Sequence, residues 1–498
     1  MKGDTAERVK TVAEINEKIR EGNVCVVTAE EMKKIVEELG AEKAAEEVDV
    51  VTTGTFGAMC STGVFLNFGH SDPPIRMQKV WLNDVEAYTG IAAVDAYLGA
   101  TQQSEKSQEY GGAHVIQELV RGEEVELRAV SRGTDCYPEK EVRTVITLED
   151  LNFAEMVNPR NAYQRYNAAT NSSSRVLRTY MGTLLPNFGN VSFAGCGEIS
   201  PLINDPDFRT IGVGTRIFLC GAKGFVVGHG TQHCPGYATL MVKGPLKEMK
   251  PEFMRAAYMP GYGVTMFVGI GVPIPVLDVE MARALAVRDE DIKTKIIDFG
   301  IQRRDRPVIR EVTYAELKSG KVEINGEEVR VSPLSSVYLA RRVMEELREM
   351  ILRGDFLLTE PVERLKEGEP MKPLRVATKL VKSVMNKAVT VSPETDVRTA
   401  ARLMIEKGLN HLPVVDGEGR LVGIITSWDI AKAVASGKTG RVGEIMTRKV
   451  ITTHPNEAVE VAARKMESYD ISALPVVDGS GKVLGIVTSE DLSKLLVR

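Results

Sequence analysis

The order of apolar and polar residues predicts alternating helices and strands at the start of the chain. Apolar residues recur every three or four positions between residues 9 and 19, as on one face of a helix. A capping-box pattern at residues 28–31 opens a second helix, which we expect to end at Gly40. The apolar run at residues 50–53 is a strand candidate. This pattern indicates a mixed α/β fold.

Further along, strands and hairpins predominate. Residues 124–130 alternate like a half-buried strand, and residues 142–146 form another. A hairpin is expected where residues 216–220 meet residues 225–227 around a Gly-rich turn, and a second one over residues 321–331 around Asn-Gly. We expect helices to begin at residues 147–150 and to occupy residues 278–286, 289–297 and 335–352.

The last quarter of the chain contains one sequence twice. Residues 411–430 and 473–492 are offset by 62 positions and identical at 12 of 20. In each copy a short apolar strand meets an Asp-Gly-x-Gly turn, a second strand follows, and Thr-Ser-x-Asp opens a helix. The repeat predicts two small αβ units packed on each other.

Hydroxyls and a carboxylate at a helix N-terminus cap free N–H groups, and they also suit a phosphate or sugar hydroxyl. The two copies resemble CBS motifs, which form βαββα-type pairs that bind adenosine ligands. This resemblance implies that the Asp of each motif binds ribose hydroxyls, with the Thr and Ser facing phosphate or another group. The implied residues are Thr426, Ser427, Asp429, Thr488, Ser489 and Asp491. The alternative is that these residues only cap helices and that the pair only dimerises.

Composition narrows the classes of function. The net charge of −5 among 131 charged residues is nearly balanced, and no Lys/Arg cluster indicates nucleic-acid binding. The apolar stretch at residues 264–277 is interrupted by Gly and Pro and is too short to span a bilayer, so no membrane association is expected. The first residues lack an apolar signal region, and six cysteines without a signal indicate reduced thiols in the cytoplasm.

Two cysteines occur in predicted turns next to strands, and the turn of Cys60 is where open α/β sheets place ligands. Cys60 follows the strand at residues 50–53 in a Gly-rich loop, although a small buried hydrophobe is an equal interpretation. Cys136 lies in a turn between two strands, with Arg132 close in sequence. A nearby cation favours the reactive thiolate, while Asp135 acts in the opposite direction. We favour a reactive Cys136 over a structural one.

Arginines in the amide-rich segments suit recognition of a small acid. Arg160 and Arg165 are candidates because a guanidinium binds a carboxylate through two hydrogen bonds, although solvated surface arginines are an equal interpretation. His229 and His233 invite a metal interpretation. Gly and Pro disfavour a helix there and no Cys-x-x-Cys occurs, so we predict no metal.

The part of the chain that precedes the repeat resembles the archaeal homocysteine-biosynthesis family. The resemblance is carried by residues 53–70, 131–138, 158–164, 180–187, 200–214 and 228–233. It implies L-aspartate semialdehyde sulfurtransferase activity, and Arg132, Arg160 and Arg165 then become substrate-binding candidates. Converting an aldehyde and sulfide to a thiol consumes two electrons. The sequence has no flavin or nicotinamide fingerprint, so the resemblance implies a separate ferredoxin-type iron–sulfur protein as electron donor.

The implied mechanism is covalent. A persulfide on Cys136 adds to the aldehyde carbon, and Cys60 resolves the resulting disulfide. The CBS pair is expected to sense S-adenosylmethionine or methylthioadenosine, with an adenine nucleotide as the competing ligand, and to favour a homodimer. No other bound cofactor is expected.

These observations divide the chain into a sulfurtransferase domain (residues 1–360), a linker (361–375) and two CBS motifs (376–437 and 438–498). Two alternatives remain at this point. One is a CBS-containing oxidoreductase like inosine-monophosphate dehydrogenase, although its CBS pair is inserted within the barrel. The other is a non-catalytic regulator that binds an adenosine ligand.

Overall fold

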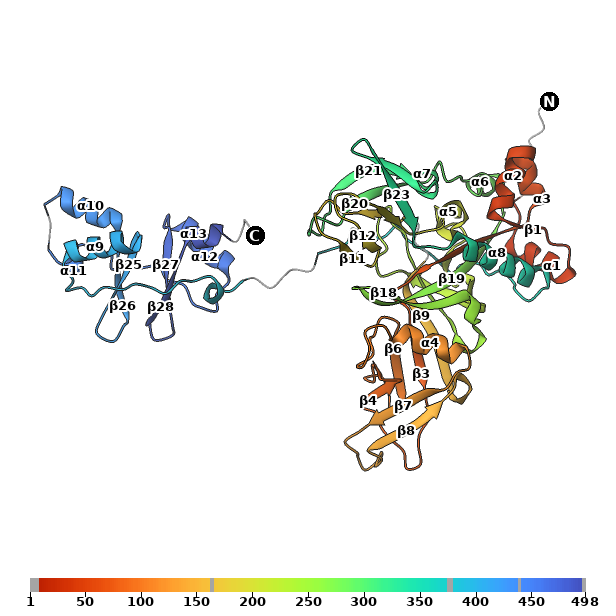
Figure 1. Ribbon diagram of the computed structural model, residues 1–498, viewed down its shortest axis with the longest axis horizontal. Coiled ribbons are helices and arrows are strands. Elements are labelled where there is room, and N and C mark those ends of the chain that lie inside the picture. The colour runs from red at the N-terminus through yellow and green to blue at the C-terminus, as the bar shows by residue number, and fades with distance from the viewer. Residues whose placement is uncertain (1–8, 162–164, 374–378, 438–439, 495–498) are drawn as a thin grey trace. The chain divides into compact units, whose positions relative to one another are not determined.

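The computed structural model describes residues 9–161, 165–373, 379–437 and 440–494. The chain divides into two compact units, residues 1–371 and 372–498. The larger unit mixes helices with three main sheets, and the smaller one contains the repeated motifs (Figure 1). The predicted mixed α/β class is confirmed.

A ten-stranded sheet organises the larger unit. Its strand order is β1-β2-β19-β15-β16-β17-β9-β3-β6, and β18 also pairs with β19. The strands are β1 (Val26–Thr28), β2 (Val50–Ala58), β3 (Gly63–Asn67), β6 (Asp95–Gly99), β9 (Phe153–Asn161), β15 (Arg216–Leu219), β16 (Ala222–His229), β17 (Leu240–Pro245), β18 (Met254–Met259) and β19 (Gly263–Pro275).

Two further sheets complete this unit, in the orders β21-β20-β10-β13-β23-β22 and β5-β4-β7-β8. The six-stranded sheet contains β10 (Ala168–Thr170), β13 (Val191–Phe193), β20 (Lys293–Asp298), β21 (Val308–Thr313), β22 (Lys321–Ile324) and β23 (Glu327–Pro333). The four-stranded sheet contains β4 (Lys79–Leu82), β5 (Val85–Ala87), β7 (Val125–Val130) and β8 (Glu141–Ile146). Two small ribbons pair β11 (Leu177–Thr179) with β12 (Gly182–Leu184) and β14 (Gly212–Val213) with β24 (Glu363–Arg364).

Helices cover the long sheet. The described helices of this unit are α1 (Val12–Glu21), α2 (Ala29–Leu39), α3 (Ala41–Glu47), α4 (Gly112–Val120), α5 (Pro201–Asn204), α6 (Val279–Ala284), α7 (Tyr314–Lys318) and α8 (Val337–Leu352). Helices α1, α2, α3 and α8 lie together at one end of the unit (Figure 1). α8 buries an apolar face that includes Val343 and Leu347 against β2 and β19. At Gly54 of β2, an added Cβ would lie 2.5 Å from the Ala340 carbonyl oxygen, so the helix approaches the sheet closely there.

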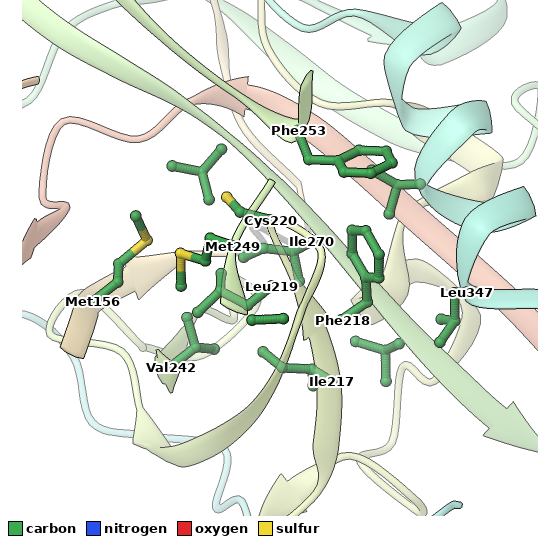
Figure 2. Close-up of a cluster of buried hydrophobic side chains, with 14 of the residues drawn as sticks. Met156, Ile217, Phe218, Leu219, Cys220, Val242, Met249, Phe253, Ile270 and Leu347 are labelled. Carbon is green, nitrogen blue, oxygen red and sulfur yellow. The ribbon is translucent and has the colours of Figure 1, made fainter. Parts of the chain in front are cut away.

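The core beneath α8 is continuous and apolar. Figure 2 shows Phe218, Phe253, Ile270 and Leu347 converging from separate elements. The rings of Phe218 and Phe253 meet edge to face with centroids 4.9 Å apart, a favourable aromatic geometry. Cys220 lies in the same cluster, fully buried, as expected for a structural thiol.

Several predicted elements are confirmed, and two are wrong. The capping box at Thr28 is present, and the hairpin of β22 and β23 turns at Asn325 and Gly326 with positive φ at both residues. The predicted helix at residues 289–297 is instead strand β20, because Thr294, Ile296 and Asp298 alternate into the interior. The helix expected from residue 147 is only a 3₁₀ turn, Leu148–Asp150, before β9.

The smaller unit follows the predicted repeat. The first motif contains α9 (Val397–Lys407), β25 (His411–Val415), β26 (Leu421–Thr426) and α10 (Ser427–Ala435). The short α11 (Val442–Ile445) lies at the start of the second motif. The second contains α12 (Val459–Ser468), β27 (Ala473–Val477), β28 (Val483–Thr488) and α13 (Ser489–Ser493). The first strand of each βαββα unit is reduced to one bridge, at Val391 and Thr453. Within the described residues no helix is long and apolar enough to cross a membrane.

The segment predicted as a linker is anchored over part of its length. β24 pairs with β14, and the Lys366 carbonyl lies 2.7 Å from His233 Nε2. Further along, Arg304 donates to the Met371 carbonyl at 2.8 Å. Residues 361–371, which we call the tether, therefore pack on the larger unit.

Candidate functional site

A cavity of about 300 Å³ opens where loops of the ten-stranded and six-stranded sheets and the β11–β12 ribbon meet. This is the small end of the range for ligand sites. Its lining includes Cys60, Arg160, Tyr166, Tyr180, Gln232 and Tyr262. We call it the thiol pocket.

Cys60 occupies the turn between β2 and β3. Its Sγ lies 3.1 Å from Thr265 Oγ1 of β19. The thiol also interacts with the Tyr262 hydroxyl. Burial, and then the neighbouring Cys60, raise the pKa of Tyr262 to about 12, so this phenol retains its proton at neutral pH.

A polar network joins the Cys60 turn to the end of β9. Ser61 Oγ donates to Asn158 Oδ1 at 2.8 Å and approaches the Arg160 carbonyl at 3.1 Å. Asn158 Nδ2 donates to Thr62 Oγ1 at 2.7 Å, and Asn158 is fully buried. Buried amides paired in this way fix the local backbone, so the thiol and Arg160 hold a defined relation.

Arg160 provides the cation of the pocket. Its Nη1 donates to Gln232 Oε1 at 2.9 Å, whereas its Nε is buried without a hydrogen-bond partner. No carboxylate pairs with this guanidinium in the described part of the chain. A cation with an unused donor in a cavity suits an anionic ligand.

Arg165 lies in a neighbouring cavity. This second cavity, of about 650 Å³, shares Tyr166, Tyr180 and Gln232 with the thiol pocket. Its charged lining residues are Arg165, Lys293, Lys295, Arg306 and Glu311, so it is strongly basic. The structure thus brings Cys60 and Arg160 together and sets exposed Arg165 to one side.

Cys136 and Arg132 lie in the exposed loop between β7 and β8. In that loop Tyr137 stacks on His70 with ring centroids 5.5 Å apart. Cys60 precedes β3, and His70 follows it. The five residues of β3 rise about 3.3 Å each, so the two ends of the strand lie on the order of 15 Å apart. Among the described residues, those lining the thiol pocket do not include Cys136.

The remaining cysteines differ in burial. Cys196 and Cys220 are buried, and burial raises the pKa of both thiols, that of Cys220 to about 12. Cys234 is half-buried and lines the basic cavity. Cys25 is exposed and directly precedes β1. No group of His, Cys, Asp or Glu that could hold a metal ion occurs among the described residues.

Sequence reasoning missed Gln232, Tyr262 and Thr265. Gln232 lies inside the His-rich run considered only for metal, Tyr262 precedes the apolar stretch at residues 264–277, and Thr265 lies within it. Their approach to Arg160 and Cys60 depends on pairing between segments about 70 to 200 residues apart. No local signal in the sequence identifies them.

In the smaller unit, both predicted motif aspartates join capping boxes. Asp429 Oδ2 accepts from the backbone N–H and hydroxyl of Thr426, and Asp491 Oδ2 does the same with Thr488. Ser427 and Ser489 are exposed at the first helical positions. The second oxygen of Asp491 accepts from Asn386 Nδ2 at 2.8 Å, while no described group donates to the second oxygen of Asp429.

Comparison with known proteins assigns a family to the larger unit and to the smaller unit. Residues 24–358 match the model of the family described as homocysteine biosynthesis enzyme, sulfur-incorporation, and residues 381–436 and 442–498 match the CBS domain. A protein of Methanosarcina acetivorans named L-aspartate semialdehyde sulfurtransferase is 56% identical over 98% of this chain and 99% of its own. A Methanocaldococcus jannaschii protein of the same name gives the same identity and coverage. A solved CBS pair, titled as a complex with 5′-methylthioadenosine and S-adenosyl-L-methionine, is 50% identical over 24% of this chain and 97% of that chain, with a TM-score of 0.23.

The fold and these matches define an enzyme of sulfur transfer with a C-terminal CBS pair. The chain belongs to the homocysteine biosynthesis enzymes of the sulfur-incorporation family. The resemblance seen in the sequence is therefore confirmed. Neither an oxidoreductase like inosine-monophosphate dehydrogenase nor a non-catalytic regulator agrees with this family. The assignments of individual site residues stay predictions.

Proposed function

We propose that this protein converts L-aspartate semialdehyde, sulfide and two electrons to L-homocysteine. The observation that carries the proposal is the 56% identity, along 98% of the chain, to two proteins named for this substrate. The thiol pocket supports it, because a thiol and an uncompensated guanidinium share one small cavity. These groups suit an aldehyde at one end of a substrate and a carboxylate at the other.

The overall reaction fixes the electron requirement. One aldehyde, one hydrogen sulfide, two electrons and two protons give one thiol and one water. Since the sequence carries no flavin or nicotinamide fingerprint, we propose that a separate ferredoxin-type iron–sulfur protein supplies the electrons.

Within this reaction, Cys136 is the proposed persulfide carrier. Its outer sulfur bonds to the aldehyde carbon while the carbonyl oxygen takes a proton. Cys60 then attacks the Cys136 sulfur, which forms a Cys60–Cys136 disulfide and releases the substrate as a hemithioacetal with a free thiol, RCH(OH)SH. Loss of water and addition of two electrons and two protons give the thiol product. Fresh sulfide opens the disulfide and restores the persulfide, so the cycle consumes two electrons in total.

This route requires the two thiols to approach each other. A disulfide needs Cα atoms within about 7 Å, and β3 separates the two residues. We therefore propose that the loop of residues 131–138 moves toward the thiol pocket during turnover. Its exposure and its position between two strand ends support such a movement.

For the smaller unit, we propose regulation by S-adenosylmethionine or methylthioadenosine, with an adenine nucleotide as the competing ligand. Homocysteine leads to methionine and S-adenosylmethionine, so an adenosyl sensor on this enzyme would respond to its end product. The paired Thr-Ser-x-Asp caps supply the hydroxyls and carboxylates for such a ligand. A homodimer is proposed from the CBS resemblance, and six unpaired cysteines suit the cytoplasm.

The test is anaerobic. Wild-type protein, Cys136→Ala, Cys60→Ser and the control Cys25→Ala are mixed with sulfide, L-aspartate semialdehyde and a low-potential one-electron donor, and homocysteine is measured by mass spectrometry. We expect product from wild type and Cys25→Ala, none from Cys136→Ala, and no more than one turnover from Cys60→Ser, because an external reductant can release the bound substrate but leaves Cys136 as a thiol that sulfide cannot convert to a persulfide. Full activity of Cys136→Ala would remove the persulfide assignment. No product from wild type, even with a reduced ferredoxin, would refute the proposed reaction.

A further inference from the structure

Gln232 contacts the guanidinium of Arg160 inside the thiol pocket. Its Oε1 accepts from Arg160 Nη1 at 2.9 Å, although 72 residues separate the two positions in sequence. Gln232 belongs to the loop of residues 230–239 between β16 and β17, and it lines the thiol pocket. Both ends of this contact therefore belong to the cavity that contains Cys60.

The contact leaves one edge of Arg160 unused. A guanidinium has five N–H donors in a planar fork, and it stays charged at any physiological pH. With Nη1 bound to Gln232, the edge formed by Nε and Nη2 is the one that matches both oxygens of a carboxylate. Nε is buried and has no partner. An unpaired buried donor is unfavourable, and a bound anion would satisfy it.

The loop is fixed on both sides of Gln232. Thr231 donates its N–H to the Pro159 carbonyl at 2.9 Å, next to Arg160 in β9. On the other side His233 is buried, receives the Thr239 N–H at 3.2 Å, and has its second ring nitrogen 2.7 Å from the Lys366 carbonyl. Gln232 thus comes from a segment whose backbone and neighbouring side chain are held before any ligand binds.

From this geometry we propose that Gln232 is a positioning residue, which turns the Nε–Nη2 edge of Arg160 into the thiol pocket to bind the α-carboxylate of the aldehyde substrate. The inference deepens the proposed function and rests on it for the identity of the substrate. Arg160 makes the contact, and Gln232 decides which edge of the guanidinium is presented. Preorganisation of this kind reduces the ordering cost of binding.

The main experiment compares Gln232→Met, which keeps the length of the side chain and removes the acceptor, with wild type. Thr231→Ala is the control, because that exposed side chain precedes Gln232 and does not line the pocket. The substrates are L-aspartate semialdehyde and 3-aminopropanal, which lacks the carboxylate. We expect Gln232→Met to raise KM for the acid about tenfold with kcat nearly unchanged, and to leave both parameters for 3-aminopropanal at the wild-type values.

A purely structural role for Gln232 predicts a different result. It would alter both substrates to the same extent, and this outcome, or an unchanged KM for the acid, would overturn the proposal. Thr231→Ala should match wild type with both substrates.

A binding measurement separates this inference from the proposed reaction. L-Homoserine has the same α-amino acid end without an aldehyde, and 3-amino-1-propanol lacks the carboxylate. By calorimetry, L-homoserine should bind wild type about tenfold more tightly than Gln232→Met, while 3-amino-1-propanol shows no difference between the two proteins. This result from a protein that forms no homocysteine would refute the reaction and retain the role of Gln232. Equal L-homoserine affinity in a protein that forms homocysteine would refute the role and retain the reaction.

Discussion

Cys25 shows how a residue's neighbours in space change its chemistry. The thiol is exposed, yet partial burial and then the Asp49 carboxylate raise its pKa. Asp49 also accepts the Cys25 backbone N–H at 3.0 Å, so the two groups are held close together. A raised pKa means less thiolate at a given pH, and the thiolate is the reactive form.

We therefore expect iodoacetamide to label Cys25 more slowly than glutathione at pH 7.5. The ordinary pKa of a thiol is about 8.5, and above this pH the labelling rate of an ordinary thiol approaches a plateau. The labelling rate of Cys25 should still rise steeply there. Mass spectrometry of the labelled peptide between pH 7 and pH 10, with glutathione in the same samples, measures both rates. A midpoint for Cys25 at or below that of glutathione would contradict the expectation.

The candidate site is only partly predictable at the residue scale. Cys60 and Arg160 are identifiable because a thiol in a Gly-rich turn and an Arg in an amide-rich segment are unusual local patterns. Gln232 and Tyr262 have no such pattern, since their roles arise from contacts with distant segments. Arg165 shows that local patterns do not assign a cavity, because a sequence pattern equal to that of Arg160 leads to a neighbouring one.

At the scale of elements, prediction succeeds where the cause is local. The capping boxes at Thr28, Thr426 and Thr488 and the Asn325-Gly326 turn depend on neighbours within four residues, and all are present. The helix prediction fails at strand β20 because its partners β10 and β21 cannot be known from its own sequence. Its extended form depends on those ladders.

The packing of α8 on β2 gives a stability prediction. At Gly54 an added Cβ would meet the Ala340 carbonyl oxygen at 2.5 Å and Met344 Cγ at 2.9 Å. We expect Gly54→Ala to destabilise the larger unit by about 1–3 kcal/mol, the usual cost of overpacking. Gly228→Ala in β16 is the control, since nothing lies within 4 Å of its added Cβ. Urea unfolding of both variants measures the difference in the free energy of unfolding. Equal stabilities would show that α8 moves to accommodate the added methyl group without loss of stability.

The tether gives a second prediction at this scale. Gly368 has φ of +88°, and an added Cβ would lie 2.8 Å from His233 Cδ2 and 3.0 Å from the His233 carbonyl oxygen. Because His233 follows Gln232, we expect Gly368→Ala to disturb the loop that holds Arg160 and to raise KM for L-aspartate semialdehyde several-fold.

The matched control for Gly368→Ala is Gly320→Ala. Gly320 has φ of +84° but open space around its Cβ position, so it carries the same backbone strain without the contact. Steady-state kinetics should show a normal KM for Gly320→Ala. An equal rise in both variants would assign the effect to general destabilisation rather than to the tether.

At the scale of the whole molecule, the two repeated motifs have similar backbones, but their aspartates differ in whether the second carboxylate oxygen already accepts a hydrogen bond. Each aspartate uses one carboxylate oxygen in its capping box. The other oxygen of Asp429 has no donor among the described residues, whereas that of Asp491 accepts from Asn386. A ribose hydroxyl that binds this oxygen of Asp491 competes with the amide for it. Losing one such hydrogen bond costs about 1 kcal/mol, or roughly a fivefold change in affinity.

If the CBS pair binds S-adenosylmethionine as proposed, calorimetry on the full chain should resolve a tighter site at Asp429 and a weaker site at Asp491. Asp429→Asn should remove the tight phase and Asp491→Asn the weak one. Asn386→Ala frees the second carboxylate oxygen, so it should tighten the weak site about fivefold and leave the tight site unchanged. Because both aspartates also cap helices, thermal unfolding of each variant without ligand separates lost binding from lost stability. Two sites of equal affinity in wild type, both unaffected by Asn386→Ala, would show that the amide does not control access and that the motifs act as identical copies.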